Sequence, residues 1–147
     1  MLEYRQIDFA GYIVSVLHGV LEMKFLRIYF VTTIGLLIIL QIQRVIWITQ
    51  KNDLTHTIGF YLTVINSVWW VVTVVAIVRL KREKLSATIP LSLAIYQAVS
   101  VLTAPFVIQL MESNQTFDMV HTVFLFLVDI LFVLLYSLLL RRLGKVQ

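Results

Sequence analysis

The sequence predicts an all-α integral membrane protein, a four-transmembrane-helix bundle with an N-terminal amphipathic helix. Its composition, its long apolar segments and the placement of its charges all support this fold class. Hydrophobic residues make up 60% of the 147 residues, charged residues make up 14%, and the mean hydropathy is +0.92. A soluble domain of this length could not bury so much apolar surface in one core, so lipid must solvate most of it.

Four apolar segments reach or exceed the ~20 residues that a helix needs to cross a ~30 Å hydrocarbon core. Unpaired backbone groups are too costly in lipid, so each segment is expected to be helical. We predict a single transmembrane domain over residues 1–147, with spans at about 28–48, 57–78, 85–111 and 119–140.

The segment before the first span, residues 7–23, allows two topologies. Its polar side chains recur at intervals of three and four and share one helical face: Arg5, Asp8, Ser15, His18 and Glu22. The uninterrupted apolar stretch of about 13 residues is short for a crossing. The pattern favours an amphipathic helix on the membrane surface. The alternative is a fifth span, which would move the N-terminus across the membrane.

Basic residues gather before the first span, in the second connection and in the tail: Arg5, Lys24, Arg27, Arg79, Lys81, Arg82, Lys84, Arg141, Arg142 and Lys145. The other two connections carry Lys51 with Asp53, and then only Glu112 and Asp118. Because basic loops stay on the cytosolic side, this alternation predicts that both termini are cytosolic.

Composition also argues against several classes of function. The chain has no cysteine, which removes disulfides, thiolate chemistry and iron–sulfur clusters. Its three histidines, His18, His56 and His121, are too far apart in sequence to form a ligand pair at helical spacing, so no metal site is predicted. The basic residues flank apolar segments and form no patch interleaved with aromatics, which argues against nucleic-acid binding. No cofactor is expected.

Asp129 is the most informative single residue, because it falls near the middle of the fourth predicted span. A charged group at that depth is costly and should face other helices. Counting along the helices places three polar residues at a similar depth, and we predict an intramembrane polar layer of Asn66, Gln97, Ser100 and Asp129. The layer is interpreted as an interhelical hydrogen-bonding group. The alternative is a proton or cation site.

Arg44, Asp118 and His121 are predicted to form an outer-level polar group. Arg44 lies about one turn from the outer end of its span, roughly 10 Å shallower than Asp129. This difference favours pairing of Arg44 with Asp118 over pairing with Asp129. Four aromatic residues are candidates for lining a lipid cavity, with ordinary helix packing as the favoured interpretation: Trp69, Trp70, Tyr61 and Tyr96.

No catalytic motif identifies an activity, so an enzyme is the less favoured class. The sequence favours a non-enzymatic tetraspan protein, acting as an accessory or assembly subunit of a membrane complex or as an organiser of membrane domains and traffic. One alternative is a small oligomeric transporter or channel subunit that uses Asp129, and another is a lipid-binding protein or lipid-modifying enzyme. The expected partners are membrane lipids and a membrane protein or further copies of the chain. The endomembrane system and the plasma membrane are the favoured locations.

Overall fold

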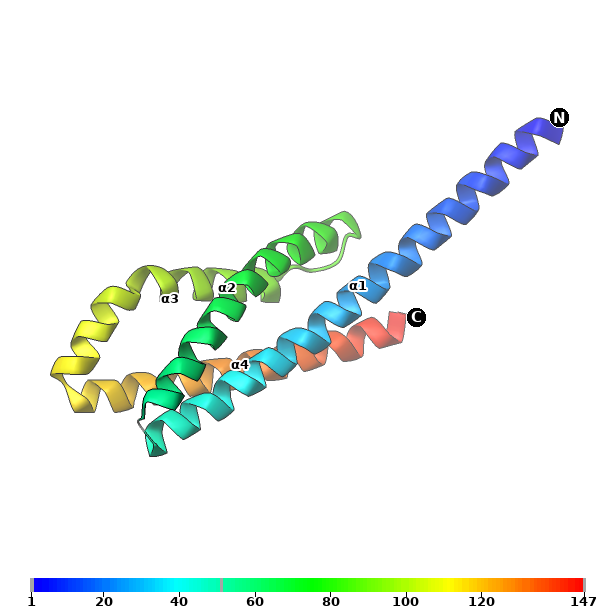
Figure 1. Cartoon of the computed structure of the whole chain (residues 1–147). Coiled ribbons are helices and arrows are strands. Elements are labelled where there is room, and N and C mark those ends of the chain that lie inside the picture. Colours follow the sequence, from blue (N-terminus) through cyan, green and yellow to red (C-terminus); the bar gives the residue numbers. More distant parts are fainter. Residues whose placement is uncertain (1, 51, 147) are drawn as a thin grey trace.

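The computed structural model describes residues 2–50 and 52–146, and the side chains of residues 9–50 and 52–145. The described chain forms four helices: α1 Leu2–Thr49, α2 Asp53–Arg82, α3 Thr88–Ser113 and α4 Gln115–Val146. All four are long and apolar enough to cross a membrane. The predicted all-α, four-helix membrane architecture is therefore confirmed, as Figure 1 shows.

The helices form an up-down-up-down bundle. α1 and α3 each pack against both α2 and α4, and within the described residues the backbones of the diagonal pairs do not come close together. The connection between α2 and α3 therefore lies at the same end as the C-terminus (Figure 1). We call this the basic end, because Arg79, Lys81, Arg82, Arg141 and Arg142 gather there. The α1–α2 and α3–α4 connections lie at the other end, which we call the distal end.

Asparagine side chains mark both distal connections. Asn52 is the N-cap of α2, where its Oδ1 accepts a hydrogen bond of 2.9 Å from the Thr55 backbone N–H. Thr55 Oγ1 accepts one of 3.1 Å from the Asn52 N–H, which completes a capping box. Asn114 Oδ1 accepts a bond of 3.1 Å from the Phe117 N–H in the first turn of α4. Lys51 lies outside the described residues. These caps fix where the distal ends of α2 and α4 begin.

α1 is one helix of 48 residues, so the predicted surface segment 7–23 and the first span 28–48 are continuous. At 1.5 Å per residue it is about 72 Å long, more than twice the ~30 Å core of a bilayer. A fifth span would need a turn between residues 23 and 28, and the backbone there is helical. Figure 1 shows the N-terminal half projecting beyond the other helices. The side chains of Arg5 and Asp8 lie outside the described residues.

The two halves of the bundle differ in packing. Buried apolar side chains from all four helices gather in the half nearer the basic end: Leu26, Tyr29, Phe30, Leu37, Ala76, Ile77, Leu80, Leu93, Ala94, Phe132, Tyr136 and Leu143. In the distal half the buried side chains include Gln41, Thr55, Gln97, Thr122 and Asp129. Most buried side chains of the basic half are thus apolar, whereas most of those in the distal half are polar.

Candidate functional site

An ion pair between α1 and α4 lies at the centre of the distal half. Asp129 is only 2% exposed, and its Oδ2 forms an ion pair with Arg44 Nη1. Gln41 Nε2 donates a hydrogen bond of 2.7 Å to the same oxygen. Gln41 and Arg44 are three residues apart, so they lie on one face of α1, the face directed at α4. The buried carboxylate is thereby matched by a cation and an amide donor.

The pairing of Arg44 with Asp129 corrects a prediction. Depth counted along the sequence favoured Asp118 as the partner of Arg44, and that preference is wrong. Counting from helix ends assumes that neighbouring helices begin at one level and run parallel, which tilted helices do not. The long stem of arginine also reaches several ångströms along the bundle axis. Leaving a buried carboxylate without a cation costs more than extending that side chain inward.

The four predicted polar-layer residues lie around one cavity of about 190 Å³, which Asn66, Gln97, Ser100 and Asp129 line together with Arg44 and Tyr96. Gln97 Nε2 donates a hydrogen bond of 3.0 Å to Asn66 Oδ1, which joins α3 to α2. Ser100 Oγ bonds the Tyr96 carbonyl oxygen of its own helix at 2.9 Å. Asp129 accepts hydrogen bonds from Gln41 and Arg44 of α1. The four residues therefore face one space, but only Asn66 and Gln97 pair with each other, while Asp129 pairs with Arg44.

A larger cavity of about 410 Å³ lies between this space and the distal end. Side chains from all four helices line it, including Trp47, His56, Met111 and His121. The two cavities share Arg44, Thr63 and Leu125 in their walls, so they are adjacent. Together they extend from near the distal end to the buried ion pair.

The predicted outer-level group is divided between two cavities. Arg44 and His121 line the larger one, and the His121 ring stacks on Phe117 with centroids 5.7 Å apart. Asp118 lines a neighbouring cavity of about 260 Å³, also bounded by Trp47 and Thr122. Thr122 Oγ1 bonds the Asp118 carbonyl oxygen at 2.8 Å. The three residues thus share the distal level and face different spaces.

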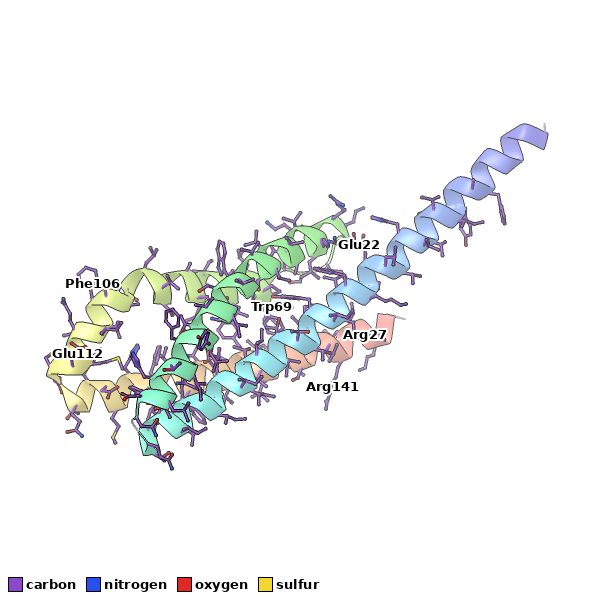
Figure 2. The ribbon with its side chains drawn as sticks, in the orientation of Figure 1. Glu22, Arg27, Trp69, Phe106, Glu112 and Arg141 are labelled. Atoms are coloured by element: carbon purple, nitrogen blue, oxygen red, sulfur yellow. The ribbon has the colours of Figure 1, made fainter. Side chains whose placement is uncertain are left out.

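The four candidate lipid-cavity aromatics lie apart. Trp69 is in the core, where Nε1 donates to Thr33 Oγ1 at 2.9 Å and its ring stacks on Tyr29 at 5.9 Å; Figure 2 shows it between α1 and α2. Trp70 Nε1 donates to the Ala94 carbonyl oxygen of α3 at 3.0 Å. Tyr61 is 63% exposed, and Tyr96 lines the 190 Å³ cavity. These positions fit helix packing better than a shared lipid cavity.

A buried hydroxyl cluster in the basic half was not anticipated from the sequence. The Tyr29 hydroxyl donates to Thr73 Oγ1 at 3.1 Å and lies 2.8 Å from the Tyr136 hydroxyl. Tyr29 and Tyr136 are 1% and 0% exposed. The available signal was spacing, because Asp129, Phe132 and Tyr136 recur at three and four residues and so mark one inward stripe of α4.

At the basic end, Glu22 joins the projecting half of α1 to α2. Glu22 is 4% exposed, and Arg79 Nη1 donates to its Oε2 at 3.3 Å. His18 Nε2 lies 3.7 Å from the other carboxylate oxygen. The Arg79 guanidinium also lies over the Phe25 ring, 4.2 Å from its centroid. Figure 2 shows Glu22 at the point where α1 leaves the bundle beside the end of α2.

Among the described residues, no group of three or more histidine, aspartate or glutamate side chains is arranged to hold a metal ion. No family of known proteins, curated protein or solved structure matches this chain. The arrangement in the distal half offers a neutral ion pair, amide groups and hydroxyls around a cavity, which is chemistry suited to binding.

Proposed function

We propose that this multi-pass membrane protein is not an enzyme and works by binding another membrane protein, as an accessory or assembly subunit or as an organiser of membrane domains and traffic. The observation that carries the proposal is the projecting half of α1. Between residues 9 and 21 every side chain is exposed except that of Gly19, which is intermediate. Large apolar residues dominate this stretch, among them Phe9, Tyr12, Val14 and Leu17.

A helix of this kind becomes more stable when its exposed apolar side chains are covered. Helices in proteins gain most of their stability from packing of an apolar face, and among the described residues no other helix buries residues 9–21. Lipid can cover part of the surface, but a rigid helix continuous with the bundle also offers a template for another helix. Small residues Gly11, Ser15 and Gly19 recur at four-residue spacing along the polar face of this segment and would allow a second helix to approach closely there. A membrane-protein partner is the occupant that this spacing favours.

The proposed orientation places both termini in the cytosol, with the distal end on the opposite side of the membrane. This is supported by the gathering of arginine and lysine residues at the basic end, where α2, α4 and the projecting half of α1 meet. An endomembrane or plasma-membrane location is the proposed setting. The projecting half of α1 would then interact on or near the cytosolic leaflet.

Site-specific photo-crosslinking tests the proposal. A crosslinking residue at Tyr12, which is 69% exposed and lies beside the Gly11–Ser15–Gly19 stripe, is compared with one at Leu134, which is 58% exposed on α4. We expect Tyr12 to capture one membrane protein, or a second copy of the chain, in stoichiometric amounts, and Leu134 to capture lipid. Substituting leucine for both Gly11 and Gly19 should abolish the Tyr12 product. Recovery of a stable monomer with equal, diffuse crosslinking at both positions would contradict the proposal.

A second candidate, a small oligomeric transporter or channel subunit, is supported by the two adjacent cavities that reach Asp129. Four helices rarely enclose a complete pathway, so this function requires several copies. It predicts that Asp129→Asn abolishes a flux in liposomes while the assembly remains intact. Normal flux in that variant would exclude the role of Asp129.

A further inference from the structure

We propose that the distal half of the bundle contains a binding site for a small polar molecule without net charge, reached from the distal end and centred on Arg44, Asn66 and Gln97. The site consists of the cavities of about 190 and 410 Å³, hereafter the inner and outer cavities. The inference concerns ligand binding and holds whether the chain assembles with a partner or takes part in transport.

The inner and outer cavities are adjacent and together are large enough for a small molecule. The inner cavity ends at the Arg44–Asp129 ion pair, and the outer cavity lies between it and the distal connections. Arg44, Thr63 and Leu125 belong to the walls of both, so a molecule that enters the outer cavity meets the inner one directly. Together the two fall within the range of roughly 300–1,000 Å³ that is typical of small-molecule sites.

The charge of the walls selects against ions. Arg44 and Asp129 are the charged side chains in the wall of the inner cavity, and they neutralise each other as an ion pair. An ion that enters this cavity would lose its hydration shell. It would gain no counter-charge in return, because Arg44 and Asp129 already pair with each other. A molecule without charged groups does not incur this cost, so the balanced pair favours a neutral ligand.

The hydrogen-bonding groups define what the ligand must carry. Gln97 is 8% exposed, and its Oε1 is buried without a partner among the described residues, while its Nε2 is held by Asn66. A ligand N–H or O–H group would supply the missing donor. Arginine carries five N–H donors, and the ion pair with Asp129 is made through Nη1 of Arg44. A carbonyl-type acceptor on the ligand would bind the remaining donors. A primary amide group satisfies both requirements.

The chain has no cysteine, so a single introduced thiol reports on the site without background. The full chain is placed in lipid nanodiscs with a single cysteine. Ser100→Cys puts the thiol in the wall of the inner cavity, and Val99→Cys is the control, because Val99 is the preceding residue of α3 and is 53% exposed. Both are treated with 2-hydroxyethyl methanethiosulfonate, a neutral water-soluble reagent. We expect Ser100→Cys to react about tenfold faster or more, because lipid suppresses the reactive thiolate at the control position.

Protection experiments then identify the ligand class. Acetamide, acetate and acetamidinium have nearly the same shape and carry charges of zero, minus one and plus one. Acetamide should slow the labelling of Ser100→Cys in a saturable way, and equal concentrations of the two ions should not. With Gln97→Leu added, the protection by acetamide, measured against that variant's own labelling rate without acetamide, should weaken about fivefold, the effect of one net hydrogen bond.

Equal labelling of Ser100→Cys and Val99→Cys would overturn the existence of the site. Protection by either ion as good as that by acetamide would overturn the assigned ligand class. Circular dichroism and gel filtration verify that each variant is folded. If Ser100→Cys does not fold, Thr63→Cys replaces it, because Thr63 lies in the walls of both cavities. These readouts measure neither partner capture nor flux, so they are independent of the tests of the proposed function.

Discussion

The guanidinium of Arg44 and the carboxylate of Asp129 meet inside the bundle, although Arg44 lies near the distal end of α1 and Asp129 midway along α4. Arg44 is 19% exposed in its side chain and Asp129 2%. The pair joins the first and last helices of the chain across the polar half of the bundle, where apolar packing is sparse. Its contribution should therefore be visible in the stability of the whole fold.

We expect Asp129→Asn or Arg44→Gln alone to lower the free energy of unfolding by about 3 kcal/mol, because each leaves an unpaired buried charge. The double variant removes both charges and should recover most of this loss. Unfolding of the four proteins in mixed micelles with increasing sodium dodecyl sulfate, followed by circular dichroism, completes the double-mutant cycle. If the double variant loses the sum of the two single losses, the two charges do not stabilise each other.

The hydroxyl cluster gives a second expectation. Tyr136→Phe removes one hydrogen bond from Tyr29 and should cost about 1 kcal/mol, whereas Tyr29→Phe removes contacts to two partners and should cost about 2 kcal/mol. Tyr61→Phe is the control, since Tyr61 is 63% exposed, and it should change stability by less than about 0.5 kcal/mol. The same unfolding assay measures all three, and equal effects at the three positions would contradict the cluster's role.

The sequence predicted the fold class well, for an identifiable reason. Spans must be helical and at least ~20 residues long in lipid, so apolar length alone locates them. The first predicted span ended at residue 48 and α1 ends at Thr49, while the third ended at 111 and α3 ends at Ser113. The continuity of α1 through residues 23–28 was missed, because Lys24 and Arg27 indicate a membrane boundary and helices cross such boundaries without interruption.

The site was predicted less completely. The residues of the polar layer were recognised because a polar side chain is conspicuous in an apolar segment. Their partners depend on helix tilt and rotation, which residue counting does not contain. Gln41, one turn of α1 from Arg44, donates directly to Asp129, and no residue count along the sequence indicates that contact. Tyr29 and Tyr136 were overlooked because tyrosine is common near membrane interfaces, which conceals a buried role.

Glu22 provides a third prediction, on how α1 is attached. Deleting residues 2–20 should leave the unfolding free energy of the bundle nearly unchanged, because residues 9–21 are not buried by other helices. Glu22→Gln should lower it by about 1 kcal/mol, since it weakens the contact with Arg79. Arg82→Gln is a suitable control, because Arg82 is exposed at the same end of α2. A large loss on deletion would mean that the projecting half contributes to the stability of the bundle.

The proposed orientation can be tested with single cysteines in sealed vesicles of known sidedness. Ser113→Cys reports on the distal end and Ser86→Cys on the basic end. A membrane-impermeant thiol reagent added on the non-cytosolic side should label Ser113→Cys at once, and Ser86→Cys only after permeabilisation. An epitope placed at the N-terminus should behave like Ser86→Cys. The reverse pattern would overturn the orientation.

The length and continuity of α1 have a mechanical consequence. The same rigid rod carries Arg44 in the distal half and extends about 30 Å beyond Glu22 at its other end. A rotation of the rod by ~10° about Glu22 would displace its N-terminal tip by about 5 Å, which follows from this helical length. A tilt of α1 caused by repacking around the ion pair would therefore move its N-terminal tip on the opposite side of the membrane. The Glu22–Arg79 contact would be the pivot of this motion.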